Sequence, residues 1–262
     1  QIQACNVPND NNCGAGEICD PGLFGGTTGC GDLAQCDNVN VGFTPLIDFI
    51  VNEEYNTYEG FLYPGSSNEP IGQHLQEGWD IAQDIEPLDI TGNPDPSGKI
   101  VLLSIGMSNT AQEFGEFMNF VDTQGGLHTN LQLVNGAQGG ADADDMADPT
   151  NQYWTDLLPS KLQNAGVSYE QVQAIWLKSA ISSPSQYGGF PEATTKLKND
   201  LNSIVRIAYT QFPNLKLIFL SSRTYAGYAS TNQNPEPYAY ESGFAVKWLI
   251  EDQINGNDLN YN

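Results

Sequence analysis

Apolar residues from position 99 onward alternate between short unbroken runs and longer stripes of helical period. The unbroken runs predict four strands, at residues 100–105, 131–134, 172–177 and 215–220. The stripes predict helices at about 110–123, 151–164, 191–212 and 238–254. Strands without polar alternation are buried on both faces, and strands that alternate with helices form right-handed parallel units. The pattern therefore predicts an α/β fold, a three-layer α/β/α sandwich with a mainly parallel sheet.

The chain before this repeating pattern divides into two parts. Residues 1–40 hold all five cysteines, spaced by Gly, Asn and Asp: Cys5, Cys13, Cys19, Cys30 and Cys36. The spacings lack the close pairs of most zinc sites, so we expect two local disulfides and one cysteine that is unpaired or intermolecular, with a metal knuckle as the alternative. Residues 41–98 are predicted to contain short helices at 42–51 and about 74–82. We expect them to form an extension that packs on the core of residues 99–256, within one domain of residues 41–262.

Charge and cysteine content limit the compartment and the partners. The chain has 32 acidic and 9 basic residues, a formal charge of −23, which repels nucleic acid and anionic membrane surfaces. No apolar run approaches the roughly 20 residues that span a bilayer. Disulfides form in oxidising compartments, and Gln1 is typical of a residue left after removal of a signal peptide. We expect a secreted or surface-attached protein, with self-association through the cysteine-rich module as one way of using an odd cysteine.

Each predicted strand is followed by a polar or glycine-rich segment. The residues of interest there are Ser108, Asn109, Asn135, Gly136, Lys178, Arg223 and Tyr225. The carboxyl ends of parallel strands meet at one edge of a sheet, so we expect these segments to converge. Thr110 and Glu113 have the spacing of a capping box, which places Ser108 at a helix N-terminus, where developing negative charge is favoured. That position suits a nucleophile, and a glycine-rich tip lets backbone N–H groups approach an oxyanion.

Three of these strand ends share a pattern with a known family. They read Gly106-Met107-Ser108-Asn109 after the first strand, Val134-Asn135-Gly136 after the second and Leu177-Lys178-Ser179-Ala180 after the third. On these segments, residues 98–256 resemble the SGNH (GDSL-type) hydrolase superfamily. The resemblance implies a flavodoxin-like, SGNH-like sandwich, with Ser108 as the nucleophile and the N–H groups of Gly136 and Ser108 as the oxyanion hole.

Two family positions are occupied differently in this chain. The third segment has Lys178-Ser179 where the family has its oxyanion Asn. Residues 234–243 stand in place of the family's Asp-x-x-His block, contain no histidine and put Tyr238 at the histidine position. The resemblance therefore implies a site whose general base differs from that of the family.

A serine hydroxyl needs a neighbouring base, and the chain has two histidines. His128 precedes the second strand, so we expect it at the opposite edge of the sheet. One alternative for the base is His74, entering from the extension, and another is Lys178 as a desolvated amine. A third is a different reaction, with acid/base work by Glu241 or Glu236 and by Tyr225 or Tyr238.

Two other clusters carry binding hypotheses. Arg223 lies among tyrosines and either clamps a carboxylate, stacks on a sugar or anchors Glu241 of the last helix. Asp142, Asp144 and Asp145 follow the glycine-rich tip and present several oxygens to calcium, with an uncommitted acidic loop as the alternative.

Together these observations predict a serine ester hydrolase that acts on acylated extracellular carbohydrate or a similar ester. It would need no organic cofactor, and calcium is the one metal that the sequence suggests. The alternative is a non-catalytic relative of the same fold. Such a protein would bind carbohydrate or form a structural subunit of an extracellular assembly.

Overall fold

Four parallel strands form the centre of the structure, a computed structural model that describes residues 17–20, 29–32, 42–227 and 232–259. The strands are β5 (Ile100–Gly106), β6 (Leu131–Asn135), β7 (Val172–Lys178) and β8 (Leu217–Leu220). They lie in the order β6-β5-β7-β8, and every neighbouring pair is parallel. The predicted α/β fold with a parallel sheet is confirmed, and each strand matches its predicted range to within two residues at either end.

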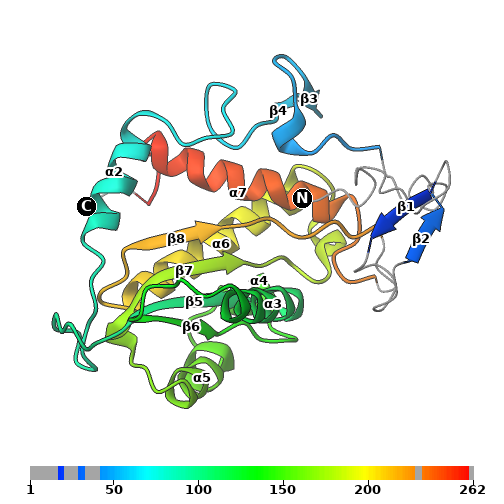
Figure 1. Cartoon of the computed structure of the whole chain (residues 1–262). Helices are drawn as coiled ribbons and strands as arrows, with labels where there is room; N and C mark the ends of the chain where they lie inside the picture. Colours follow the sequence, from blue (N-terminus) through cyan, green and yellow to red (C-terminus); the bar gives the residue numbers. More distant parts are fainter. Residues whose placement is uncertain (1–16, 21–28, 33–41, 228–231, 260–262) are drawn as a thin grey trace.

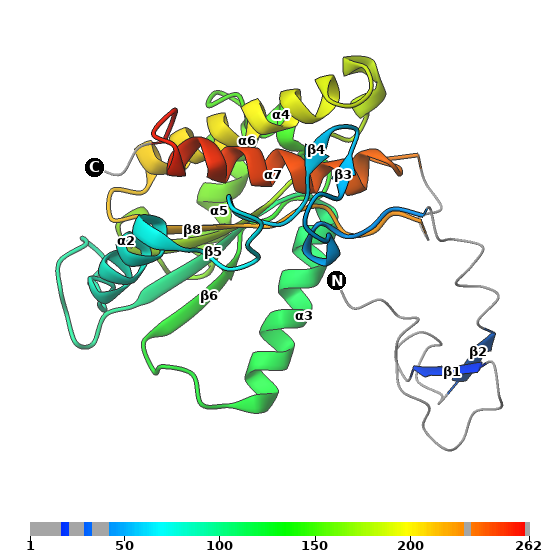
Figure 2. The ribbon, with the colours of Figure 1, turned by 90° about the horizontal axis from the view of Figure 1, so that it is seen from above.

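Helices cover both faces of this sheet (Figures 1 and 2). Helix α3 (Ser108–Gln124) packs on one face. The other face carries α5 (Leu158–Asn164), α6 (Glu192–Gln211) and α7 (Tyr238–Ile254). The helix predicted over 151–164 is present as a π-helical turn, η3 (Tyr153–Leu157), that continues directly into α5, and Pro159 lies where the two join.

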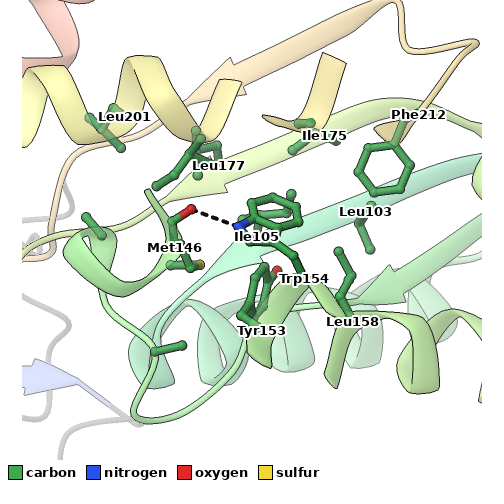
Figure 3. Packing of buried hydrophobic residues seen from close by; sticks show 14 of the residues in the cluster. Leu103, Ile105, Met146, Tyr153, Trp154, Leu158, Ile175, Leu177, Leu201 and Phe212 are labelled. Carbon is green, nitrogen blue, oxygen red and sulfur yellow. Dashed lines mark hydrogen bonds between the residues drawn. The ribbon is translucent and has the colours of Figure 1, made fainter. Parts of the chain in front are cut away.

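The strand residues alternate between two apolar clusters, one on each face. In β5, Val101, Leu103 and Ile105 are fully buried against the layer of α5, α6 and α7, whereas Leu102 packs against the cluster under α3. Figure 3 shows the larger cluster, in which the indole Nε1 of Trp154 donates a hydrogen bond to the Met146 carbonyl at 2.8 Å. Burial on both faces explains why the strands lack polar alternation in the sequence.

The extension contributes η2 (Leu46–Asp48), β3 (Glu54–Tyr55), β4 (Tyr58–Glu59) and α2 (Gly72–Gln83). Leu46 and Phe49 are buried against Phe244 of α7, and Tyr55 donates a 2.8 Å hydrogen bond to Glu241. The prediction of a helix over 42–51 was wrong, because only the single 3₁₀ turn η2 forms within that range. Helix α2 extends the predicted 74–82 helix by two residues at its start and one at its end, and it contacts β8.

Little of the cysteine-rich segment is described. β1 (Glu17–Asp20) and β2 (Gly29–Asp32) pair antiparallel, with Cys19 opposite Cys30 in register. The other cysteines, and every cysteine side chain, lie outside the described part of the molecule, so the disulfides stay a prediction. Within the described residues, no helix has the length and apolar character needed to cross a membrane.

Candidate active site

The topology of the sheet marks one place where a ligand is expected. From β5 the chain moves outward to β6 and then crosses back to β7 on the other side of β5. The order of the strands therefore reverses between the carboxyl ends of β5 and β7. In open α/β sheets, ligands bind in the crevice outside such a switch point. Ser108 and Ser179 follow these two strands almost at once.

Gly106 shapes the connection from β5 to Ser108. Its φ is +155°, and a Cβ atom there would lie 1.9 Å from the Lys178 carbonyl oxygen, so no larger residue fits. Met107 is the N-cap, and Ser108 is the first residue of α3, with its side chain exposed to solvent. The first-turn N–H groups of a helix have no intrahelical acceptor. Ser108 therefore lies where backbone donors and an open surface meet.

The predicted capping box of Thr110 and Glu113 was wrong, because the N-cap of α3 is Met107, three residues before Thr110. The Thr110 hydroxyl instead donates a 2.6 Å hydrogen bond to the carbonyl of Lys178, which joins the first turn of α3 to β7. The Glu113 carboxylate, freed from capping, accepts hydrogen bonds from Lys178 and Thr224. Instead of capping the helix locally, Thr110 and Glu113 contact residues that follow two other strands, Lys178 of β7 and Thr224 after β8.

The glycine that faces Ser108 is Gly139. A Cβ atom on Gly139 would lie 3.7 Å from Cβ of Ser108, and the neighbouring Gln138 N–H donates a 2.8 Å hydrogen bond to the Gly106 carbonyl. Gly136, which the sequence favoured, is buried, and its N–H donates to the Val134 carbonyl at 3.1 Å. The glycine-rich tip does reach Ser108, but through a residue three positions further along than the family resemblance implies.

Asn135 also serves the scaffold. Its amide nitrogen donates to the Ala111 carbonyl at 2.7 Å, and its amide oxygen accepts from the Ser104 hydroxyl at 3.1 Å. These bonds tie the end of β6 to β5 and to the first turn of α3. Asn135 therefore positions the helix that carries Ser108.

Lys178 forms a compact polar cluster with Glu113 and Thr224. The side chain of Lys178 is 7% exposed, and its ammonium donates to the Glu113 carboxylate and, at 2.6 Å, to the Thr224 hydroxyl. The Thr224 hydroxyl donates in turn to Glu113 at 2.5 Å. Burial lowers the pKa of Lys178, and the ion pair with Glu113 opposes that shift only in part. Glu113 was missed as a site residue, although it follows Asn109 at i+4 on the same helix face.

Asn109 and Arg223 bring unpaired polar atoms to the same edge. Among the described residues, neither atom of the Asn109 amide has a hydrogen-bond partner, although both are buried, and the same is true of Arg223 Nε. Burial lowers the pKa of Arg223, whereas the charges of Glu113 and Glu236 raise it. Buried polar groups without partners are rare in folded proteins.

The loop after β8 is held against the start of α7. The Arg223 backbone N–H donates to the Ser242 hydroxyl at 2.8 Å, and the Glu236 carboxylate accepts from the N–H groups of Ala226 at 2.8 Å and Tyr240 at 2.9 Å. Within the same loop, a Cβ on Gly227 would meet the Tyr225 ring and hydroxyl, so Tyr225 folds back onto this glycine. These contacts fix the place from which Arg223 projects.

The hydrogen bonds of Glu241 and Tyr238 are to residues outside the Lys178 cluster. Glu241 is 3% exposed, accepts from the Tyr55 hydroxyl and makes no ion pair with Arg223 in the described structure. Burial raises the pKa of Glu241, and the Tyr55 hydrogen bond partly offsets this. The Tyr238 hydroxyl donates to the Gly188 carbonyl at 3.1 Å. Both residues therefore lie in the interface of α7 with other parts of the chain.

The histidines lie elsewhere. His74 is in α2, with its ring centroid 5.8 Å from that of Tyr63, and burial lowers its pKa. Figures 1 and 2 show α2 at the opposite end of the strands from the first turn of α3. His128 is exposed in the connection from α3 to β6, as expected. The structure does not bring His74 to Ser108.

The carboxylates of Asp142 and Asp144, which follow the glycine tip, form hydrogen bonds and an ion pair within the protein. Asp142 caps the short helix α4 (Ala143–Met146), accepting from Asp145 N–H at 3.1 Å and from Ser182 N–H at 2.7 Å. Asp144 pairs with Lys196 and accepts from a tyrosine hydroxyl. The described part of the chain contains no cluster of three or more side chains suited to a metal ion. Calcium binding stays a prediction.

Comparison with known proteins adds no relative. No protein-family model matches the chain, and a search of curated proteins finds no match. The class of protein is therefore defined by the fold: an α/β protein with a four-stranded parallel sheet. At its switch point, an exposed serine, a glycine tip and a cluster of buried Lys178 with the more exposed Glu113 and Thr224 come from four different strand ends.

Proposed function

We propose that the protein is a secreted ester hydrolase of SGNH type, with Ser108 as its nucleophile. The observation that carries the proposal is the position of Ser108, which is exposed, is the first residue of α3 and lies at the switch point. Its Cβ would lie 3.7 Å from a Cβ atom added to Gly139. Acylated extracellular carbohydrate or a similar small ester is the proposed substrate. Self-association through residues 1–40 belongs to the same proposal.

In this reaction the Ser108 hydroxyl attacks the ester carbonyl and gives up its proton to a base. The carbonyl oxygen becomes an oxyanion, which the N–H groups of the first turn of α3 and of the Gly139 tip stabilise. The alcohol leaves with a proton, and water then hydrolyses the acyl-serine. Arg223 and Asn109, whose polar atoms lack partners in the described structure, would orient the substrate.

Lys178 is the proposed base. It ends β7 directly opposite Gly106 in the sheet register, two residues from Ser108, whereas His74 lies at the far end of the strands. A lysine accepts a proton only as the free amine, and burial lowers the pKa of Lys178 toward that form. Activity should therefore rise with pH through the alkaline range and level off above the pKa of Lys178.

The first prediction concerns Ser108. Labelling by a fluorophosphonate probe and hydrolysis of p-nitrophenyl acetate and acetylated xylan should be lost in Ser108→Ala, with kcat down about a thousandfold or more. The matched control is Ser185→Ala, which removes another exposed serine hydroxyl and should leave both readouts unchanged. Lys178→Met should abolish the alkaline rise in rate, while His74→Ala should retain it. Turnover that survives in Ser108→Ala would refute the proposal.

One observation favours a second function, carbohydrate binding without turnover. Lys178 already donates hydrogen bonds to the Glu113 carboxylate and to the Thr224 hydroxyl, so in this arrangement its side chain is engaged by the protein rather than by Ser108. A wild-type protein that neither reacts with the probe nor cleaves any ester, yet binds glycan, would establish this alternative.

A further inference from the structure

A groove of about 310 Å³ lies between α6 and α7, beside β4. Helices α6 and α7 cover the face of the sheet opposite α3, so the groove is separated from Ser108 by the sheet (Figure 2). The residues that carry the argument are Tyr58, Thr195, Lys198, Trp248, Asp252 and Asn255. The groove is open to solvent rather than enclosed.

Two aromatic rings form the apolar part of the groove. The centroids of Tyr58 and Trp248 are 5.0 Å apart, and both side chains are half-buried. Trp248 also packs on Phe190 at 5.6 Å and on Phe244 at 6.0 Å. These deeper rings hold Trp248 in place before any ligand binds. A preformed aromatic surface costs little conformational entropy when it is used for binding.

Polar groups lie along the same groove. Lys198 forms an ion pair with Asp252, which fixes both side chains, while Thr195 and Asn255 are exposed. The groove thus offers a carboxylate, an ammonium, an amide and a hydroxyl next to aromatic rings. A sugar ring has the matching surface, because its C–H face stacks on an aromatic ring and its hydroxyl edge both donates and accepts hydrogen bonds.

The charge of the chain further limits which ligands can bind in the groove. The groove is lined by Lys198, Asp252 and Glu251, Glu251 also pairs with Lys247, and the whole chain carries −23. Such a field repels anionic ligands such as uronates, phosphates and sulfated glycans. We propose that this groove is a binding site for one or two units of a neutral carbohydrate, independent of the Ser108 site and of the proposed hydrolase activity.

The test uses the full chain and calorimetric titration with xylohexaose, cellohexaose, mannohexaose and chitohexaose, plus a galacturonate oligomer as the anionic probe. We expect at least one neutral oligosaccharide to bind and the anionic probe not to bind. Trp248→Ala should weaken that affinity about tenfold or more. The matched control is Trp79→Ala, which removes a tryptophan that is 63% exposed on α2 and should not change affinity.

Two further variants keep the test decisive. If Trp248→Ala does not fold, Thr195→Arg, an exposed helix position, should block the groove without disturbing the core. Ser108→Ala should bind as well as the wild type. The proposal is overturned if no neutral probe binds, if the folded groove variants bind like the wild type, or if Ser108→Ala loses binding, which would place the sugar at the switch point. If Ser108→Ala loses esterase activity but still binds the oligosaccharide, the carbohydrate-binding proposal is supported.

Discussion

At the scale of single residues, many polar groups beside the switch point bond the backbone of neighbouring segments. Asn135 spans β5 and α3, Thr110 joins α3 to β7, and Glu236 holds the loop after β8 against α7. Each bond removes conformations from a segment that carries a site residue. These bonds preorganise the candidate site through side chains that contact the protein itself.

Gly106→Ala is expected to destabilise the protein by about 2–4 kcal/mol. The added Cβ would collide with the Lys178 carbonyl at the point where β5 and β7 pair, at a φ that L-residues rarely adopt. Urea unfolding followed by circular dichroism measures the change in free energy of unfolding.

The control for this substitution is Gly115→Ala inside α3. The nearest atom to its added Cβ is an amide nitrogen at 3.9 Å, so the variant should gain about 0.5–1 kcal/mol from helix propensity. Equal stability of Gly106→Ala and the wild type would contradict the close approach of β5 and β7 described above.

At the scale of elements, α4 depends on its cap more than the longer helices do. A helix of four residues cannot offset its own nucleation cost, so it forms only where other groups hold its ends. Asp142 supplies both a capping box and a hydrogen bond to Ser182, which follows β7. This links the segment after the glycine tip to the carboxyl end of β7.

Asp142→Ala should therefore cost about 1–2 kcal/mol of stability. Asp142→Asn, which keeps an acceptor for one of the two N–H groups, should cost less. Asp148→Ala, an exposed loop aspartate with only local hydrogen bonds, is the matched control and should cost least. Chemical denaturation of the three variants gives the order, and a loss in Asp148→Ala equal to that in Asp142→Ala would contradict this role of the cap.

At the scale of the whole molecule, acidic residues greatly outnumber their partners. Within the described residues, five of the 9 basic residues form ion pairs, and the chain has 32 carboxylates, so acidic groups repel one another with few cations nearby. Self-repulsion of this kind destabilises the compact state and is screened by salt.

Raising NaCl from about 0.02 M to 0.5 M, where the Debye length falls from over 20 Å to about 4 Å, should raise Tm by several degrees. Differential scanning calorimetry measures this, with equal osmolality of sucrose as the control for excluded-solute effects. Calcium chloride at matched ionic strength tests the calcium prediction. A further rise in Tm that Asp144→Asn removes would support a bound ion, and a Tm that falls with NaCl would contradict the repulsion argument.

The pattern of the sequence determined the α/β class, the four strands and the long helices. These features follow from local periodicity, because a strand buried on both faces needs an apolar run and a helix on a sheet needs an apolar stripe. The same pattern placed Ser108 between β5 and α3, because the sequence shows at which residue the apolar run of the strand ends. It failed at the capping box, where a local motif competed with distant partners.

Only the tertiary structure decided which residues meet at the switch point. Lys178 joins Glu113 across 65 residues of sequence and Thr224 across 46, and Gly139 rather than Gly136 faces Ser108. His74 had the right chemistry for a base but lies in a helix at the other end of the strands. Such meetings depend on how the strands are ordered and how far each loop reaches, and neither leaves a periodic signal in the chain.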